Sequence, residues 1–441
     1  MSAAAPPASR GAEARPGAGR AALVAIRRGV THVFLPVAVA GQALAWTIYA
    51  VTHAFRPWSW VKIGTAYTLS SAHVAFDVSI AAGTRSDPEG ISEGRLVVAL
   101  GGFVILAAVL LFRAGRDAGR AVPRVPTEAP MPGARLEPLL HAGLIGGLVG
   151  VGFAVPCAIV ATFVRLSFPP TIALLRPVVW QALVWPLLLG AVVGALGSLS
   201  VISWTDRSGA GERIAEAARG AWSAFLTASA LAFAGFLVLA AIETGATSAY
   251  ARAIGREGPV GAVLVVHHAL LLPNQASMIL STSMGAPAEL SVDGETAARL
   301  SIRGIDTVGD YGTFAGAYLG LSGDHLGFPW WYRLFVLAPA VGTVLGGRRA
   351  AARAPDRREA FVRASAAGVG FAVLSAAAAW IAAIAVPIVL DGATIRFDAN
   401  PSTTLLVGMP WGIVGGLLGS RIGSRPGLRA RLRSRSRGEP R

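Results

Sequence analysis

Cysteine is nearly absent from this 441-residue chain, in which Cys157 stands alone. One thiol cannot form an internal disulfide, and it cannot supply a cysteine metal cluster. Lysine is equally scarce, because Lys62 is the only lysine among 39 basic residues and the rest are arginines. An arginine excess of this kind is typical of a GC-rich genome and needs no binding function. The sequence therefore gives no support for redox chemistry or for a zinc site.

Charge is the second shortage, and it decides the class of protein. Only 14% of the residues are charged, whereas 54% are hydrophobic and the mean hydropathy is +0.57. Soluble domains carry about 25% charged residues, so a soluble globular protein is excluded. The 53 glycines fit helices that approach closely in lipid. We expect an all-α fold, a polytopic integral membrane helix bundle.

The apolar stretches give an expected span count. A crossing of about 30 Å of hydrocarbon takes roughly 17 to 25 helical residues. Eight stretches qualify: 29–54, 96–112, 138–164, 178–203, 217–242, 331–347, 364–390 and 403–420. Two segments are irregular: 62–83 carries His73 and Asp77 among small polar residues, and 260–284 is interrupted at Leu272-Pro273-Asn274-Gln275.

The arginine-rich stretches predict the orientation, because arginines near span ends stay on the cytoplasmic side. Both termini are then cytoplasmic, in the cytoplasmic (inner) cell membrane. Residues 1–28 form a disordered tail without signal-peptide character, 421–441 form a basic tail, and the acidic loop 285–330 is extracytoplasmic. An even number of crossings between basic stretches predicts that 62–83 does not span and that 260–284 is a re-entrant hairpin.

Two sequence matches predict a parallel internal duplication. Residues 150–155 recur identically at 368–373, an offset of 218, and residues 190–198 match 412–420 at six of nine positions, an offset of 222. The first membrane repeat would be 29–203, the cytoplasmic linker 204–216 and the second repeat 217–420. We expect a pseudo-twofold axis along the membrane normal, with the two irregular segments meeting beside it. Paired interrupted segments are typical of transporter binding sites.

Six polar residues in the irregular segments are the candidate site. His73 and Asp77 are four residues apart and would share a helix face, which suits proton relay, although both could simply be solvated at the membrane interface. His267, His268, Asn274 and Gln275 could line a polar cavity, or could only satisfy the backbone that Pro273 frees. Their spacing does not provide the three or four converging ligands of a metal site.

Reaction motifs are missing from the sequence. It has no Walker loop, no nucleophile elbow, no H-E-x-x-H and no dinucleotide fingerprint, so we expect neither an enzyme nor a cofactor. The arginine-rich C-terminal tail directly follows a span. Such a run attracts anionic lipid headgroups more often than nucleic acid.

Two short motifs carry a family resemblance. Leu110-Leu111-Phe112-Arg113-Ala114-Gly115-Arg116 closes a span, and Leu272-Pro273-Asn274 lies in an apolar segment. Both resemble the uncharacterised bacterial multi-pass membrane family that includes PerM. The resemblance implies an envelope or cell-division-associated protein with no established enzymatic activity.

The sequence leaves two main functional hypotheses and a third, weaker one. The first, which we favour, is a noncatalytic scaffold or accessory protein with membrane protein partners. The other is a permease or channel for a small solute or ion, using the two irregular segments at the repeat interface; an intramembrane enzyme ranks third.

Overall fold

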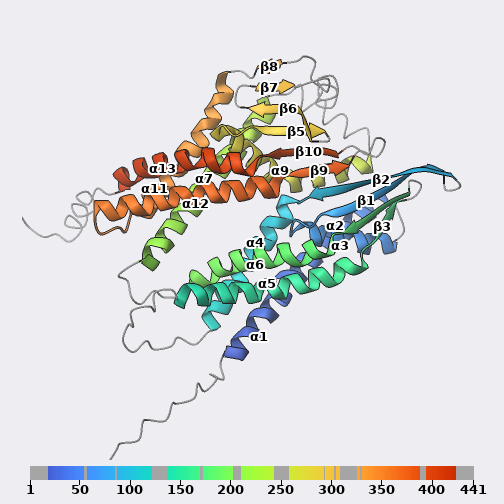
Figure 1. Ribbon diagram of the computed structural model, residues 1–441, viewed down its shortest axis with the longest axis horizontal. Coiled ribbons are helices and arrows are strands. Elements are labelled where there is room, and N and C mark those ends of the chain that lie inside the picture. Colours follow the sequence, from blue (N-terminus) through green and yellow to red (C-terminus); the bar gives the residue numbers. More distant parts are fainter. Residues whose placement is uncertain are drawn as a thin grey trace, which may run out of the picture.

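The computed structural model describes residues 18–53, 57–84, 87–121, 137–168, 172–201, 210–242, 258–292, 294–301, 304–307, 325–327, 330–387 and 394–423. Most of these residues are helical, and a ten-stranded antiparallel sheet lies at one end of the long helices (Figure 1). Residues 1–17 and 424–441 of the expected tails lie outside the described residues, whereas residues 18–28 of the expected disordered tail form a helix. Residues 204–209 of the expected linker also lie outside the described residues, and the rest of it is the start of a helix that begins at Ala210.

We call residues 18–199 the first unit and residues 210–423 the second unit. The first unit contains α1 (Ala18–Arg28), η1 (Gly29–Phe34), α2 (Leu35–Thr52), α3 (Pro57–Ser70), β1 (Phe76–Thr84), β2 (Asp87–Val98), α4 (Gly101–Ala121), α5 (Glu137–Phe163), β3 (Leu166–Phe168), β4 (Ile172–Pro177) and α6 (Val179–Leu199). The second unit contains α7 (Ala210–Ile242), α9 (Pro259–Met284), β5 (Ala288–Val292), β6 (Glu295–Ser301), β7 (Gly304–Thr307), β8 (His325–Gly327), η3 (Trp330–Val336), α11 (Leu337–Ala351), α12 (Arg357–Ala382), β9 (Ile384–Pro387), β10 (Thr394–Ala399) and α13 (Pro401–Gly423).

Six helical stretches of the described chain are long and apolar enough to cross a membrane: Gly19–Thr52, Gly143–Phe163, Val179–Leu199, Glu212–Val238, Arg357–Ala382 and Pro401–Gly423. They coincide with six of the eight expected spans and fit an α-helical membrane protein. The other two expected spans fall on α4 and α11, which are not among the six. Helix α4 carries Arg113, Arg116, Asp117 and Arg120, and α11 has only 15 residues.

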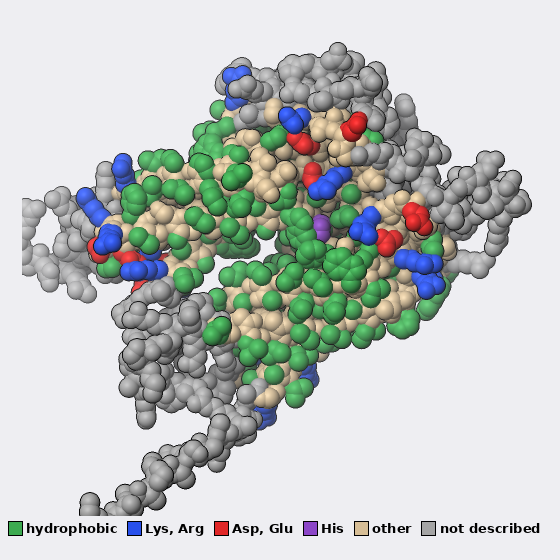
Figure 2. Space-filling model, in the orientation of Figure 1, with side chains coloured by type: hydrophobic (Ala, Val, Ile, Leu, Met, Phe, Trp, Pro, Cys, Tyr) green, Lys and Arg blue, Asp and Glu red, His purple; other side chains and the backbone are tan. Residues whose placement is uncertain are grey.

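The helical surface is apolar in the middle and charged at its ends. Figure 2 shows hydrophobic side chains over both groups of helices, with charged side chains near the sheet and at the far helix ends. On α5, for example, Val155, Ile159 and Phe163 are exposed. Large apolar side chains that face outward over several turns fit a lipid environment.

The expectation of an all-α helix bundle is confirmed only in part, because the connections between helices pair into one sheet. Its strand order is β3-β4-β1-β2-β9-β10-β5-β6-β7-β8. β3 and β4 connect α5 to α6, and β9 and β10 connect α12 to α13. Part of the expected acidic loop 285–330 is β5 to β8. Several strands have only three to six residues, which is too short to produce a clear alternation of apolar and polar residues.

The strand pairing recurs at the same offsets as the sequence matches. In the first unit Leu166 of β3 faces Leu175 of β4. In the second unit Ile384 of β9 faces Phe397 of β10, which lie 218 and 222 residues later. Beside these hairpins, β1 pairs with β4 and β5 pairs with β10. The two units thus arrange four strands in the same order.

The tightest helix contacts recur in the same way. A Cβ added to Gly190 on α6 would overlap the Cα of Gly150 on α5. A Cβ added to Gly412 on α13 would overlap the carbonyl of Gly368 on α12. Gly368 and Gly412 lie 218 and 222 residues after Gly150 and Gly190. Glycine is required at all four positions, because only its missing side chain lets the backbones approach.

Helices α4 and α11 also occupy matching places. A Cβ on Gly115 of α4 would overlap the carbonyl oxygen of Gly194 on α6. A Cβ on Gly347 of α11 would overlap the carbonyl oxygen of Gly416 on α13. Gly115 in the first unit therefore corresponds in its packing to Gly347 in the second.

The expected pseudo-twofold axis is wrong. A twofold axis would bring identical strands of the two units together at the centre of the sheet. Instead β2 pairs with β9, with Val97 facing Ala385 and Val98 facing Ile384. Strand β9 is the first strand in the second unit's order, as β3 is in the first unit's order. The last strand of the first unit therefore pairs with the first strand of the second, a head-to-tail arrangement.

Both irregular segments differ in detail from the expectation. Residues 62–83 comprise the end of the 14-residue helix α3, a turn and most of strand β1, and the segment is not among the six candidate spans. The expected re-entrant hairpin at 260–284 is wrong, because α9 is one continuous helix with Pro273 inside it. Proline is tolerated within a helix when neighbouring chain segments surround it.

Candidate functional site

Asn274 lies on α9 at the junction of the two units and is 2% exposed. Its side-chain oxygen Oδ1 accepts a hydrogen bond from the backbone N–H of Gly101 at 2.9 Å, and Nδ2 donates to the carbonyl of Ala99 at 2.9 Å. Nδ2 also donates to the carbonyl of Ala382 at 3.4 Å. One side chain thus binds the start of α4 in the first unit and the end of α12 in the second. These bonds satisfy helix-terminal groups that the helices themselves leave open.

A second contact between the units lies about two turns before Asn274 on α9. The hydroxyl of Tyr67 on α3 and Nε2 of His267 form a 2.8 Å hydrogen bond. Tyr67 also stacks on Phe103 of α4, with ring centroids 6.2 Å apart. His268 is half-buried beside His267. The irregular segments do meet, as expected, but through a ring and hydroxyl contact between two helices.

Gln275 follows Asn274 on α9 and is only half-buried as a residue. Its Oε1 atom is nevertheless buried and has no hydrogen-bond partner among the described residues. A buried amide oxygen without a partner costs free energy relative to an apolar group of the same shape. Gln275 is therefore not part of the bonded junction that Asn274 forms.

His73 occupies the turn between α3 and β1, with a positive φ of 59°. The corresponding turn between α9 and β5 has Gly285, with φ 102°. A left-handed conformation is unfavourable for histidine, so the surroundings must hold it in place. Its ring contacts Trp380 of α12 at a centroid distance of 4.4 Å, and Trp380 contacts Trp185 of α6 at 4.8 Å.

Burial among these groups lowers the pKa of His73 to about 4, because the charged imidazolium is poorly solvated there. Its Nδ1 atom is buried and has no hydrogen-bond partner among the described residues. A neutral ring in contact with the indole of Trp380 acts as a packing group. The backbone N–H of Ala75, two residues on, donates to Oε1 of Gln181 on α6 at 2.9 Å and fixes the turn.

The predicted pairing of His73 with Asp77 on one helix face is wrong. Helix α3 ends at Ser70, and Asp77 lies on strand β1. Asp77 is exposed and forms an ion pair with Arg95 of β2, with its Oδ1 3.2 Å from Nε. Both side chains are more than half exposed, so this pair contributes little to stability.

A buried charge network lies at the opposite ends of the helices. Arg363 of α12 is 4% exposed, and its Nε is 2.9 Å from Oε1 of Glu359, one turn earlier. Glu359 also accepts from Arg213 of α7 at 2.8 Å, and Arg363 Nη1 lies 3.3 Å from Glu212. These pairs connect α7 to α12. Because each buried charge has a partner, the network holds α7 and α12 together.

Several residues of the junction were not expected from the sequence. Gly101, Tyr67 and Trp380 are ordinary residues of apolar segments, and their partners lie more than 100 residues away. The sequence signal for this contact is the glycine pair Gly101-Gly102 at the start of α4, because a Cβ on Gly101 would overlap Oδ1 of Asn274.

No protein-family model, curated protein or solved structure matches this chain. Among the described residues, three or more His, Cys, Asp or Glu side chains nowhere gather in a way that could hold a metal ion. The candidate site is therefore interpreted from its geometry alone. That geometry consists of polar side chains bonded to backbone groups of both units.

Proposed function

We propose that this protein is a noncatalytic integral membrane scaffold or accessory protein of the cytoplasmic membrane, whose extracytoplasmic sheet is the surface that membrane protein partners recognise. The observation that carries the proposal is the side chain of Asn274, which is bonded to both units at once. An alternating-access transporter needs an interface that opens and closes. The hydrogen bonds of Asn274 join the two units beside the sheet, which supports a fixed interface.

The orientation belongs to the same proposal. Arginine-rich ends remain cytoplasmic by the positive-inside rule, so the sheet at the opposite helix ends is extracytoplasmic and both termini are cytoplasmic. The pairs Gly150 with Gly190 and Gly368 with Gly412, which recur at offsets of 218 and 222, support an internal duplication in parallel orientation. The resemblance to the family that includes PerM agrees with a role in cell division or envelope upkeep.

Labelling of single cysteines tests the orientation. Glu295 on β6 and Pro355 between α11 and α12 are both exposed. In a Cys157→Ala background, Glu295→Cys should react with an impermeant maleimide added to intact cells, and Pro355→Cys should react only after the membrane is permeabilised. Protection of Glu295→Cys in intact cells would place the sheet in the cytoplasm and contradict the proposal.

A reversible crosslink tests scaffold against transporter. Val97 of β2 and Ala385 of β9 are paired across the unit junction. In a Cys157→Ala background, Val97→Cys with Ala385→Cys should form a disulfide that fixes the units together. A scaffold should still complement a strain lacking the protein when the crosslink is complete. Complementation that is lost on oxidation and recovered on reduction would contradict the scaffold, and each single-cysteine variant is the matched control.

A permease or channel is the second candidate. Figure 2 shows an open gap between the two groups of helices, on the side away from the sheet. The buried Oε1 of Gln275 lacks a partner among the described residues, as a solute-binding group would. A permease predicts that proteoliposomes release small ions or solutes faster than empty liposomes and that Gln275→Leu abolishes this release. Equal release from both liposome types would exclude it.

A further inference from the structure

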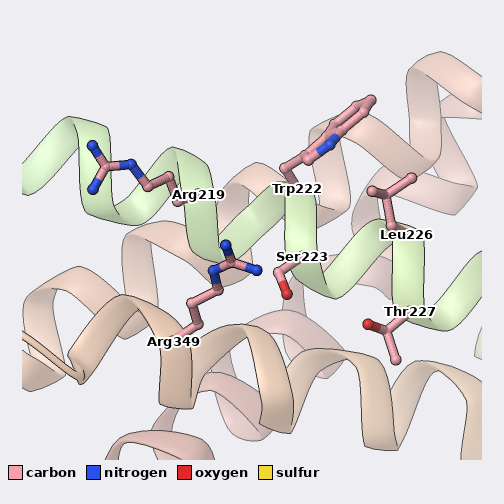
Figure 3. A pocket seen from close by; sticks show the side chains of 6 residues that line it. All are labelled: Arg219, Trp222, Ser223, Leu226, Thr227 and Arg349. Atoms are coloured by element: carbon pink, nitrogen blue, oxygen red, sulfur yellow. The ribbon is translucent and has the colours of Figure 1, made fainter. Parts of the chain in front are cut away.

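A cavity of about 320 Å³ lies between α7 and α11, on the far side of the helices from the sheet (Figure 3). It is lined by Arg219, Trp222, Ser223, Leu226, Thr227 and Arg349. In Figure 3, Arg349 reaches from α11 towards α7, while Ser223 and Thr227 face α11. The cavity therefore combines two guanidinium groups with two hydroxyls at the end of an apolar helix.

The charge around this cavity is positive. Nη1 of Arg219 is 2.6 Å from Oε1 of Glu216, but the same oxygen also lies 3.1 Å from Nη1 of Arg353. The side chain of Arg349 has neither an ion pair nor a hydrogen bond among the described residues, and the residue is exposed. One carboxylate thus serves two arginines while a third has no acid to neutralise it. In Figure 3 the guanidinium of Arg349 points towards Ser223, whereas that of Arg219 points away from it. A phosphate group is an anion that a guanidinium group binds well.

The remaining lining suits a lipid better than a fully solvated ion. Arg219, Ser223 and Thr227 follow one another at four-residue intervals and form a polar stripe that leads into the apolar part of α7. Beside the stripe, Trp222 and Leu226 are 51% and 48% exposed. Tryptophan is typical of the boundary between headgroups and acyl chains. A headgroup would bind the stripe while its acyl chain lies along Trp222 and Leu226.

The first unit provides an internal comparison. Because Gly115 and Gly347 occupy matching places, Arg349 on α11 corresponds to Asp117 on α4. Asp117 forms an ion pair with Arg120, with Oδ1 3.5 Å from Nη1. An acidic residue at this position repels a phosphate group. At this position the second unit therefore has a cation, Arg349, where the first unit has an anion, Asp117.

We propose that the cavity between α7 and α11 binds the phosphate group of an anionic phospholipid, with Arg349 as its ligand and Arg219 as a second positive charge beside it. The site is separate from the junction around Asn274 and from the extracytoplasmic sheet.

Native mass spectrometry of the full-length protein in detergent tests the proposal. The probes are short-chain phosphatidylglycerol, phosphatidylcholine of the same chain length, and inorganic phosphate. Wild-type protein should bind phosphatidylglycerol about tenfold more tightly than phosphatidylcholine, and Arg349→Gln should remove this preference, since one charge-assisted contact corresponds to about a tenfold change in affinity. Arg349→Lys should retain part of it. Inorganic phosphate should compete only weakly, because it lacks the acyl chains.

The matched control is Arg120→Gln, which removes an exposed arginine from the corresponding end of α4 and should leave the preference unchanged. Thermal unfolding of each variant is the control for the fold, and we expect midpoints close to that of the wild type because the replaced side chains are exposed. An unchanged preference in the double variant Arg219→Gln with Arg349→Gln would overturn the site. Equal binding of both lipids by wild-type protein, or competition by inorganic phosphate at the lipid's own concentration, would overturn the lipid assignment.

Discussion

The backbone N–H of Gly101 donates to the side chain of Asn274, a residue 173 positions later in the chain. Gly101 begins α4 in the first unit, and Asn274 lies inside α9 in the second. The side-chain amide of Asn274 also donates from Nδ2 to the carbonyl of Ala382 at the end of α12. Three chain segments that are far apart in sequence therefore meet at one buried side chain, beside the strand pair that joins the two units.

The first prediction concerns this side chain. Asn274→Ala leaves the buried N–H of Gly101 and the carbonyl of Ala99 without partners, at a cost of about 2 to 4 kcal/mol. The midpoint of thermal unfolding in detergent should fall accordingly. The neighbouring substitution Gln275→Leu is the control and should be neutral or stabilising, because Oε1 of Gln275 has no partner among the described residues to lose. A larger loss for Gln275→Leu than for Asn274→Ala would refute this account.

The second prediction concerns the recurring glycine contacts. Gly150→Leu and Gly368→Leu should each lower the free energy of unfolding by about 2 to 3 kcal/mol, because the new side chains must push apart α5 from α6 and α12 from α13. Gly147→Ala on α5 should be neutral, since no heavy atom lies within 4 Å of the added Cβ. Thermal unfolding of the three variants provides the comparison, and equal stability of all three would show that close packing is not required.

The third prediction concerns His73 and pH. Its pKa is about 4 in the folded protein, and an unfolded histidine titrates near 6.5. Below about pH 6.5 the unfolded chain binds a proton that the folded chain does not, so folding stability is fully present above pH 6.5 and declines towards pH 4. We expect a loss of about 1 to 2 kcal/mol between pH 7 and pH 5 from this residue.

The measurement compares wild type with His73→Asn across this pH range. Asparagine accepts the left-handed backbone and does not titrate. The other histidines are present in both proteins, so the difference between the two pH profiles isolates residue 73. Parallel profiles would show that His73 is solvated and titrates normally.

The fourth prediction concerns the buried pair of Glu359 and Arg363. Glu359→Leu should cost about 3 kcal/mol, because it leaves the guanidinium of Arg363, which is 4% exposed, with only Glu212 as a partner. The double variant Glu359→Leu with Arg363→Met should regain part of that loss, since an apolar pair needs no compensation. A double-mutant cycle on thermal unfolding measures the coupling, and additive losses would mean that the two charges act independently.

The membrane helices could be predicted from the sequence, because hydropathy over a span-length window needs no knowledge of tertiary contacts. The glycine matches at offsets of 218 and 222 could also be read directly, and they fall on the helix pairs that pack closest. Both signals are local or periodic. The twofold symmetry inferred from them was wrong, because the pairing of β2 with β9 depends on which sheet edges are free.

The sheet and the junction were beyond sequence reasoning for a physical reason. β3 and β8 have three residues each, and their stability comes from neighbouring strands. The break expected at Pro273 did not occur, because the surrounding segments keep α9 helical. The prediction that His73 and Asp77 share a helix face was wrong, because four-residue spacing places two side chains on one face only while a helix continues. Helix α3 ends at Ser70, before either residue.

The order of the strands also limits what another molecule of this protein could do. The edge of β2 that faces away from β1 pairs with β9. In the second unit the strand that corresponds to β2 is β6. On β6 that side is occupied by β7, and β7 is followed by β8. A second copy of the chain therefore cannot pair with β6 in the way that β9 pairs with β2, so the sheet does not extend into a filament by this contact. On this side the described sheet ends at β8, whose three residues provide few backbone groups for pairing with another chain.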